Sequence, residues 1–382
     1  KTGLLIGIGG VSMSPLAEVL HDAGLDIRGS DMAESSNTLT LRERGIPIHI
    51  GHSADNVTDD ISFVIRTAAV HDDNPEVHEA HRRGIPVFER TQAWGALMRG
   101  YQNALCISGT HGKTTTTSMC THIMMAAEKD PTVMIGGTLP LLKACHRVGK
   151  GNTIIMESCE YYNSFLALNP TIAVVLNIEA DHLDFFKDLE DIKHSFRCFA
   201  ERVPAETGTV IANYDDANTM DALRGIARKV ITFGLNAKAD VYAQNIVHRG
   251  SVSEFDIYHR GNYFARVTLH VPGIHNVRNA LAATAAAIVL GVSPNAVKYG
   301  LAGFEGAGRR FDFKGKFQGA DLYDDYAHHP SELRALLDAV DTLNYQRTIV
   351  VFQPHTYSRT AKLFNDFVEQ LRRPTIVYLA EI

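Results

Sequence analysis

The sequence has few cysteines and no long apolar run, and it therefore lacks the features typical of disulfide-bonded secreted proteins and of membrane proteins. Its five cysteines are scattered singly among 382 residues, with no Cys-x-x-Cys pair. This argues against a disulfide framework and a structural zinc site. No apolar run approaches the ~18 residues of a membrane-spanning helix, and the apolar start has no signal-peptide cleavage pattern. We therefore expect a cytoplasmic protein with reduced thiols and no membrane insertion.

Neither positive nor negative charges are in large excess. Lysine and arginine number 37 and aspartate and glutamate 43, for a formal net charge of −6, and no Lys/Arg-rich block occurs. The charge therefore gives no electrostatic reason to expect a nucleic acid or an anionic membrane as partner. A phosphate-bearing ligand would instead need backbone donors and a few placed cations. The sequence leaves the oligomeric state open.

The first 100 residues alternate short β-rich runs with helical stretches. Examples are the runs 4–8, 46–50, 63–67 and 86–88 and the helix-like stretch 15–23. Alternation of this kind is typical of βαβ units and a parallel sheet. We predict an α/β protein whose N-terminal Rossmann-like domain covers residues 1–100.

Residues 101–307 predict a central domain with a parallel sheet and an antiparallel patch. Buried parallel strands are indicated by the apolar runs 104–108, 153–156 and 172–176. Antiparallel strands are indicated by the alternating runs 241–246, 253–259 and 263–271, which Gly-containing turns connect. A long Ala-rich helix is expected at 277–290.

The α/β rhythm restarts at residue 308. Strands are predicted at 322–325, 348–352 and 375–379, and helices at 331–343 and 359–371. About 75 residues make only half of a doubly wound domain. We therefore expect residues 308–382 to form an incomplete, truncated C-terminal Rossmann-like domain.

The sequence Gly-Thr-His-Gly-Lys-Thr at 109–114, here called the phosphate loop, follows a predicted strand and opens a helix. Glycines let successive N–H groups turn toward an anion, and a helix N-terminus favours negative charge. Lys113 can reach phosphate oxygens, and the Thr114 hydroxyl can bind Mg²⁺. The spacing departs from the usual phosphate-loop pattern because residue 107 is Ile. The alternative is a glycine turn with a solvated lysine.

A second glycine turn follows the first predicted strand and approaches a dinucleotide-binding fingerprint, although serine replaces its third glycine. Three interpretations stay open: a tight βα turn, a nicotinamide dinucleotide site, or a site for the pyrophosphate of a nucleotide sugar. The residues that the third interpretation places at the ligand are Gly7, Gly9, Gly10, Ser12, Ser30 and Asp31.

Acidic residues and a histidine follow two predicted parallel strands. Glu157 and Glu160 come after the run 153–156, and Asp181 and His182 come after 172–176. The carboxyl ends of parallel strands face the ligand crevice, where these groups could hold divalent cations against a phosphate. Oxygen ligands suit Mg²⁺, and one histidine in a Mg²⁺ or Mn²⁺ shell is unusual. Each residue could instead be a helix cap or a satisfied surface group.

Several separated motifs, taken together, resemble the Mur ligases in their order and spacing. They lie at 109–114, 177–182, 273–280, 308–311, 323–330 and 352–360, and with the turn at 7–16 they cover nearly the whole chain. The resemblance implies a three-domain fold and ATP-dependent ligation of L-alanine to UDP-N-acetylmuramate through an acyl phosphate. Alternatives within this resemblance are a murein-peptide ligase, which lacks the stretch 352–355, and a truncated fragment that binds nucleotide sugar and ATP without catalysis.

The resemblance also implies roles for individual residues. Lys113, His182, His328 and Arg359 would be catalytic, and Thr114, Glu157 and His182 would bind Mg²⁺ or Mn²⁺. ATP would contact Gly109, Thr110, His111, Gly112, Lys113, Thr114, Thr115, His275, Asn276, Asn279, Arg310 and Asp325. Tyr326, His328 and Arg359 would surround the alanine and the sugar nucleotide. His328 would be either the base or a binding residue. Many family members carry arginine where this chain has Thr356, so only Arg359 is carried over.

Two functions from other classes explain less of the sequence. A nicotinamide-dependent oxidoreductase would use the turn at 7–12 but would leave the phosphate loop unexplained. A phosphate-loop kinase or GTPase would use Lys113 but would leave the N-terminal turn and the His-rich C-terminal motifs unexplained.

Overall fold

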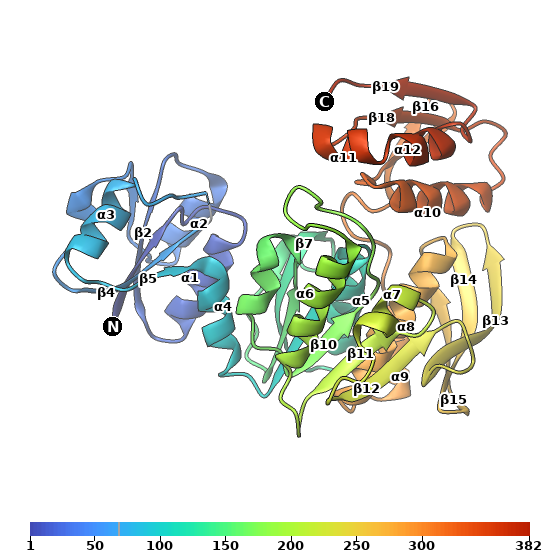
Figure 1. The fold of residues 1–382 in the computed structure, drawn as a ribbon, viewed down its shortest axis with the longest axis horizontal. Coiled ribbons are helices and arrows are strands. Elements are labelled where there is room, and N and C mark those ends of the chain that lie inside the picture. Colours follow the sequence, from blue (N-terminus) through green and yellow to red (C-terminus); the bar gives the residue numbers. More distant parts are fainter. Residues whose placement is uncertain (68) are drawn as a thin grey trace. The chain divides into compact units, whose positions relative to one another are not determined.

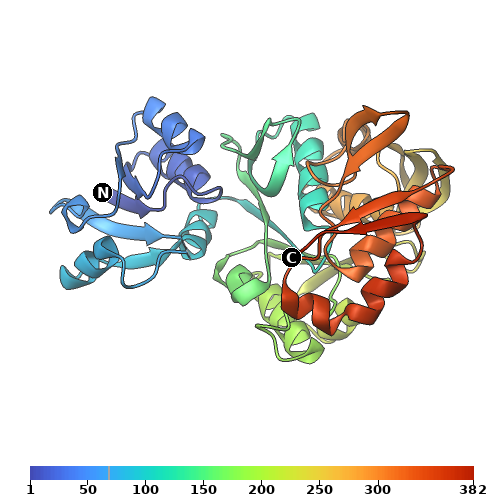
Figure 2. The same ribbon diagram turned by 90° about the horizontal axis from the view of Figure 1, so that it is seen from above.

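The computed structural model describes residues 1–67 and 69–382, which form two compact units (Figures 1 and 2). Unit 1 contains residues 1–101, 146–150 and 167–169, and unit 2 contains residues 102–145, 151–166 and 170–382. Both units combine helices with parallel strands, so the predicted α/β class is confirmed. No helix in the described part of the chain has the length and apolarity to cross a membrane.

Unit 1 is a five-stranded parallel sheet in the order β3-β2-β1-β4-β5 (Figure 1). Its strands are β1 Thr2–Ile6, β2 Asp26–Asp31, β3 Ile48–Ile50, β4 Ile61–Arg66 and β5 Val87–Glu89. Its helices are α1 Met13–Asp22, α2 Ser36–Glu43, η1 Ala54–Asn56, α3 Pro75–Arg82 and α4 Arg90–Met98. The predicted strand 4–8 ends earlier, at Ile6, because Gly7 turns the chain with a φ of 77°.

Unit 2 is built on a ten-stranded sheet in the order β15-β14-β13-β12-β11-β10-β6-β9-β7-β8. The parallel part contains β6 Asn103–Ser108, β7 Thr132–Leu139, β9 Thr153–Glu157, β10 Ile172–Val175, β11 Thr209–Asn213 and β12 Lys229–Gly234. The edge strand β8 is Ala144–Arg147, and its last two residues belong to the stretch 146–150 that is grouped with unit 1. The predicted antiparallel patch is confirmed as β13 Val241–Arg249, β14 Val252–His259 and β15 Asn262–Leu269.

Helices cover this sheet and build its core. They are α5 Lys113–Ala126, η2 Tyr161–Ala167, α6 Leu189–Glu201, α7 Ala217–Ala222, α8 Ile274–Val289 and α9 Pro294–Ala302. The Ala-rich α8 packs against α5 and against β11, β12 and β13, because small side chains allow close approach on more than one side. α5 also packs against α9.

The C-terminal part of unit 2 contains two small sheets. β16 Asp312–Phe317 and β17 Ala320–Asp324 form an antiparallel hairpin, and β18 Ile349–Phe352 pairs in parallel with β19 Ile376–Leu379. The strand predicted at 322–325 therefore belongs to a hairpin. α10 Pro330–Asp341 packs against α12 Phe364–Leu371 (Figure 1). The single helix predicted at 359–371 is wrong: Leu363, at φ −108° and ψ 21°, separates α11 Tyr357–Lys362 from α12.

The packing of α9 on α5 predicts that Gly300→Ala destabilises unit 2. A Cβ at residue 300 would lie 2.5 Å from the Ile123 Cα, so the helices would have to separate. We expect a loss of about 1–3 kcal/mol, seen as a lower thermal unfolding midpoint. Gly303→Ala is the control, because its nearest heavy atom would be 3.4 Å away. Equal midpoints for the two variants would contradict this packing.

Candidate functional site

The phosphate loop joins β6 to α5 at the carboxyl edge of the parallel sheet. Gly109 and Gly112 have φ values of 145° and 83°, which side chains rarely adopt. A Cβ would also lie 2.8 Å from the Leu176 Cβ at residue 109 and 2.7 Å from the Asn279 Oδ1 at residue 112. Both glycines are thus required by conformation and by space, as the motif predicts.

Asn177, which the sequence analysis assigned no role, fixes the loop. Its backbone oxygen accepts from the Thr110 amide at 3.0 Å, and its side-chain oxygen accepts from the His111 amide at 2.8 Å. The Asn177 side-chain nitrogen donates to the His111 carbonyl at 3.0 Å. The first intrahelical bond of α5 runs from the Thr116 amide to Gly112. The amides of residues 113–115 precede that bond and point out of the helix start, as an anion site requires.

Lys113 makes a buried ion pair at the base of the loop. Its Nζ lies 3.0 Å from Glu160 Oε2 and also donates to the carbonyls of Gly109 and Thr110, at 2.5 and 3.1 Å. Burial alone would lower the pKa of Lys113, but the neighbouring Glu160 carboxylate outweighs it and the pKa is raised. Lys113 is therefore positively charged. Glu160, a candidate cation ligand, is its counter-ion here.

Thr114 and Glu157 lie side by side at the carboxyl edge of the sheet. The Thr114 hydroxyl donates to Glu157 Oε1 at 3.0 Å, and the Gly136 amide donates to Glu157 Oε2 at 2.6 Å. The hydrogen bond from the Gly136 amide fixes the Glu157 carboxylate beside the Thr114 hydroxyl. A hydroxyl oxygen and a carboxylate oxygen form part of a donor set suited to a hard divalent cation.

His182, the third predicted metal ligand, has different neighbours. Its ring stacks on Tyr161 with centroids 4.2 Å apart, and its Nε2 lies 3.8 Å from Asp181. Burial lowers the pKa of His182, so the ring is neutral near pH 7. Nothing within the described ranges brings His182 into contact with Thr114 or Glu157.

A buried ion pair connects α11 to the loop after β10. Arg359 donates to both carboxylate oxygens of Asp181, at 2.8 and 3.2 Å, and both side chains are less than one-tenth exposed. Burial alone would raise the pKa of Asp181, but Arg359 and His182 outweigh it and the pKa is lowered. Asp181 is thus the counter-ion of Arg359. The pair borders a cavity of about 250 Å³, which His182, His355 and Thr356 also line.

A larger cavity, of about 580 Å³, lies between the phosphate loop, α8 and α10. The ATP-binding residues predicted from the sequence that line it are His111, Gly112, Thr114, Thr115, His275, Asn276, Asn279, Arg310 and Asp325. Gly109, Thr110 and Lys113, also predicted to contact ATP, are not among its lining residues. Asn213, Asp215 and Asp216 also line it and were missed. Asn213 is the last residue of β11 and the two aspartates follow it, so their position at the end of a buried strand was the available signal.

Asp325 and Tyr326 organise the segment before α10. Asp325 accepts from the amides of Phe311 and Ala327, each at 2.7 Å, and burial raises its pKa. The guanidinium carbons of Arg309 and Arg310 lie 4.6 and 5.5 Å from the centroid of the Tyr326 ring, within cation–π range. The predicted ATP residues and substrate residues are thus neighbours here.

His328 has a defined hydrogen-bonding pattern. Its Nδ1 lies 2.8 Å from the Tyr326 carbonyl oxygen, which can only accept. Nδ1 therefore carries the hydrogen, and the neutral ring presents a lone pair on Nε2. Burial lowers the pKa of His328. The ring is neutral near pH 7 and is able to accept a proton.

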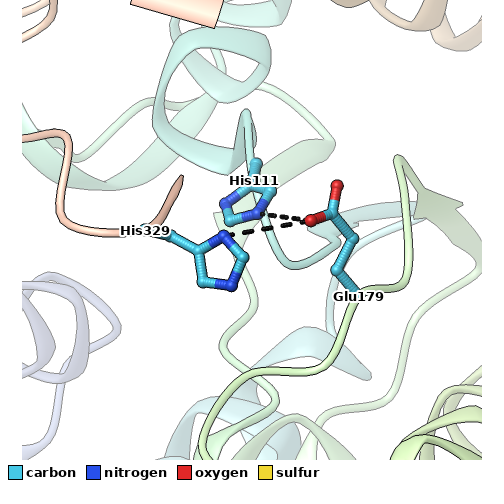
Figure 3. Close-up of side chains that lie close together, drawn as sticks. All are labelled: His111, Glu179 and His329. Carbon is cyan, nitrogen blue, oxygen red and sulfur yellow. Dashed lines mark ion pairs between the residues drawn. The ribbon is translucent and has the colours of Figure 1, made fainter. Parts of the chain in front are cut away.

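Two histidines and a glutamate form a cluster that includes His111 of the phosphate loop (Figure 3). His111, Glu179 and His329 come from three separate segments, and both imidazole rings approach one oxygen of Glu179. His111 also lies 3.3 Å from Glu332. Burial alone would lower the pKa of His111, but Glu179 and Glu332 outweigh it and raise the pKa to about 9.

The N-terminal turn of unit 1 brings together most of the residues predicted for it. The amides of Gly7 and Ile8 both donate to the Ser30 carbonyl, and the Gly9 amide donates to Asp31 at 2.8 Å. The Ser30 side chain is buried and donates to Glu76 at 2.7 Å, so it faces the interior. Gly10 and Ser12 continue the turn into α1, and the Ser12 side chain makes no cap bond.

Family models match three consecutive stretches of the chain. The Mur ligase family catalytic domain matches residues 5–102, the Mur ligase middle domain residues 107–287, and the Mur ligase glutamate ligase domain residues 309–381. The UDP-N-acetylmuramate–L-alanine ligase of Agathobacter rectalis is 46% identical over 99% of this chain and 82% of its own length. The enzyme of the same name from Clostridium novyi is 45% identical with the same coverage.

Solved structures show the same relationship. The UDP-N-acetylmuramate–alanine ligase from Thermotoga maritima has a TM-score of 0.78 and 30% identity, over 100% of this chain and 90% of that one. A ligase from Neisseria meningitidis that joins UDP-N-acetylmuramate to a tripeptide has a TM-score of 0.71 and 26% identity, over 80% of this chain and 98% of that one.

The position of His111 between two carboxylates predicts a loss of stability at alkaline pH. Because its pKa is raised from 6.5 to about 9, its stabilising effect is complete below pH 6.5 and is lost as pH rises through 9, by at most about 3 kcal/mol. Of the other groups facing it, burial lowers the pKa of His329, and the pKa values of Glu179 and Glu332, which burial alone would raise, are lowered by His111, so these groups titrate at lower pH than His111.

The measurement is the thermal unfolding midpoint between pH 6 and 9.5, with a chelator present. His111→Asn is the comparison, because it retains all other titrating groups. We expect a smaller fall in midpoint for the variant than for the unchanged protein. Parallel curves would contradict the charged state of His111.

Proposed function

The chain belongs to the Mur ligase family, and we propose that it catalyses ATP-dependent ligation of L-alanine to UDP-N-acetylmuramate in peptidoglycan biosynthesis. The products would be UDP-N-acetylmuramoyl-L-alanine, ADP and phosphate. The observation that carries the proposal is identity of about 45% over 99% of the chain to ligases named for this reaction. Membership of the Mur ligase family argues against the two alternatives from other classes, a nicotinamide-dependent oxidoreductase and a phosphate-loop kinase or GTPase. Because the reaction consumes ATP, we place it in the cytoplasm.

The chemistry requires a better leaving group than the carboxylate offers. A carboxylate oxygen attacks the γ-phosphorus of ATP, the bond from that phosphorus to the β,γ-bridging oxygen breaks, and ADP leaves. The neutral amine of alanine then attacks the carbonyl carbon of the acyl phosphate. The tetrahedral intermediate collapses with loss of phosphate, and the nitrogen loses its extra proton.

The first step brings two anions together. Carboxylate and γ-phosphate must approach to about 3.5 Å, where their repulsion at an effective dielectric of 20 is roughly 4–5 kcal/mol. Lys113 is charged and lies at the loop that would hold the phosphates. It can offset this repulsion by exchanging its contacts with the loop carbonyls for phosphate oxygens. Glu160 would keep the ammonium in place.

A divalent cation is part of the proposal. The Thr114 hydroxyl and the Glu157 carboxylate, 3.0 Å apart, fit Mg²⁺ because both offer hard oxygen ligands. When bound there, Mg²⁺ would neutralise charge on the transferring phosphoryl group. His182 keeps its proposed role as a further ligand, and Mn²⁺ is the cation that a histidine would favour over Mg²⁺.

His328 is the proposed acceptor of the amine proton. Its ring is neutral near pH 7, with its Nε2 lone pair unused by the Tyr326 contact. Arg359 is held in position by Asp181. Its guanidinium would bind a carboxylate of one of the incoming substrates, close to His328. The twelve ATP residues, led by Asn276, Asn279 and Asp325 around the large cavity, would hold the nucleotide. The turn at residues 7–12 of unit 1 would hold the sugar nucleotide, with Asp31 beside it.

A murein-peptide ligase is the second candidate. The structural similarity to the Neisseria meningitidis ligase favours it. Phosphate release that depends on L-alanine supports the first candidate, whereas release that depends on a murein tripeptide but not on alanine supports the second.

Replacing Lys113 should abolish turnover without unfolding the protein. We expect Lys113→Ala to lower kcat by at least about 1,000-fold, because the cation that offsets the repulsion between the anions is lost. ADP formation dependent on both substrates is the measurement. Lys129→Ala, an exposed lysine beyond the end of α5, is the control and should keep normal activity. Near-normal turnover of Lys113→Ala would remove Lys113 from the mechanism.

Replacing Glu157 should raise the requirement for Mg²⁺. Glu157→Gln keeps the shape and the bond from Gly136 but removes the charge that holds the cation. We expect the Mg²⁺ concentration for half-maximal activity to rise by at least about 10-fold. Glu128→Gln, at an exposed position, is the control. An unchanged Mg²⁺ dependence would show that Glu157 is not a ligand.

A further inference from the structure

The cluster of His111, Glu179 and His329 has the geometry of a metal site that is separate from the proposed Mg²⁺ site. One ligand atom from each residue lies within 4.8 Å of the other two. Glu179 Oε2 is 3.5 Å from His111 Nε2 and 3.9 Å from His329 Nδ1. Figure 3 shows both rings directed at this oxygen. No other group of three such side chains was found in residues 1–67 and 69–382.

The hydrogen bonds of His329 determine which nitrogen is free to bind a metal. The Ser331 amide donates to His329 Nδ1 at 3.2 Å, so Nδ1 presents a lone pair. The other nitrogen, Nε2, lies 3.4 Å from the Ala180 carbonyl oxygen and carries the hydrogen. The lone pair of Nδ1 is on the side of the ring that faces Glu179.

His111 is oriented by a carboxylate in the corresponding way. Its Nδ1 lies 3.3 Å from Glu332, and its Nε2 is buried without a hydrogen-bond partner. When Nδ1–H faces Glu332, the lone pair of Nε2 is directed at the Glu179 oxygen. In the metal-free protein the proton of the charged His111 occupies this position, and a metal ion would displace it.

We propose that His111 Nε2, His329 Nδ1 and Glu179 Oε2 form a binding site for a transition-metal ion such as Zn²⁺. Two imidazoles and one carboxylate are a ligand set typical of Zn²⁺. The other ring nitrogen of each histidine lies near a hydrogen-bond acceptor. This acceptor is Glu332 for His111 and the Ala180 carbonyl oxygen for His329. Such acceptors orient the ligand histidines of metal sites.

Charge also favours a divalent cation over an uncharged ligand. The cluster includes two carboxylates, those of Glu179 and Glu332, and both lie within ion-pair distance of the His111 ring. A divalent ion would balance them. Mg²⁺ is disfavoured here because it prefers oxygen ligands, whereas imidazole suits Zn²⁺, Co²⁺ and Ni²⁺.

Metal binding would replace one existing hydrogen bond and would link three segments of the chain. His329 Nδ1 would give up the Ser331 amide bond, and the Ser331 hydroxyl, which donates to Glu179 Oε2, would shift to the other carboxylate lone pairs. The metal would join the phosphate loop, the loop after β10 and the N-terminus of α10. This role concerns how these three segments are held together, and it adds to the ATP contact proposed for His111.

Metal titration of the purified protein tests the proposal. The full chain is stripped with a chelator and titrated with Zn²⁺ by calorimetry and with Co²⁺ by visible absorption, in excess Mg²⁺ to occupy oxygen sites. We expect one strongly bound ion per chain and a tetrahedral Co²⁺ spectrum without thiolate charge-transfer bands.

The decisive variants are His329→Asn and Glu179→Gln. Asparagine is a good helix N-cap, so it can replace the capping bond of His329 at α10 while removing the imidazole. Each variant should weaken Zn²⁺ binding by at least about 10-fold. His182→Asn, in the proposed Mg²⁺ site, is the matched control and should bind Zn²⁺ as the unchanged protein does.

Three results would overturn the proposal. They are the absence of stoichiometric Zn²⁺ binding, loss of binding in His182→Asn with retention in His329→Asn, and a Co²⁺ spectrum showing thiolate ligation. Circular dichroism of each variant excludes misfolding as the cause of lost binding.

Discussion

The structure of the site depends on the carboxyl ends of three adjacent parallel strands, β9, β6 and β10. Parallel strands deliver the residues that follow them to one edge of the sheet. The phosphate loop follows β6, the stretch containing Glu157 and Glu160 is at the end of β9, and the loop from Asn177 to His182 follows β10. The contacts of Lys113 with Glu160, of Thr114 with Glu157 and of the loop amides with Asn177 all result from this arrangement.

Charge balance then fixes the positions of the functional side chains. Lys113 pairs with Glu160, Arg359 pairs with Asp181, and His111 lies between Glu179 and Glu332. Removing one member of a buried pair costs about 3–5 kcal/mol, because the remaining charge is left uncompensated. The cations are therefore held in defined places, and electrostatic stabilisation of a transferring phosphoryl group requires such preorganised charges.

Local patterns predicted the α/β class, the antiparallel patch and the need for Gly109 and Gly112, because strand alternation and glycine conformation are properties of short segments. They did not predict which charges pair. Asp181 and Arg359 are 178 residues apart, and Ser331 and Glu179 are 152 apart, so only the folded chain reveals these contacts. Glu160 was a candidate cation ligand and is the partner of Lys113. The break at Leu363 was missed because the apolar pattern continues through it.

The central claim is that the phosphate loop serves to convert a carboxylate into an acyl phosphate. UDP-N-acetylmuramate labelled with ¹⁸O in its carboxylate tests this most directly, with mass analysis of the inorganic phosphate released during ligation to alanine. Because the oxygen that attacks phosphorus departs with the phosphate, the account predicts one labelled oxygen per phosphate for fully labelled carboxylate. Unlabelled phosphate, formed together with the amide product, would contradict it.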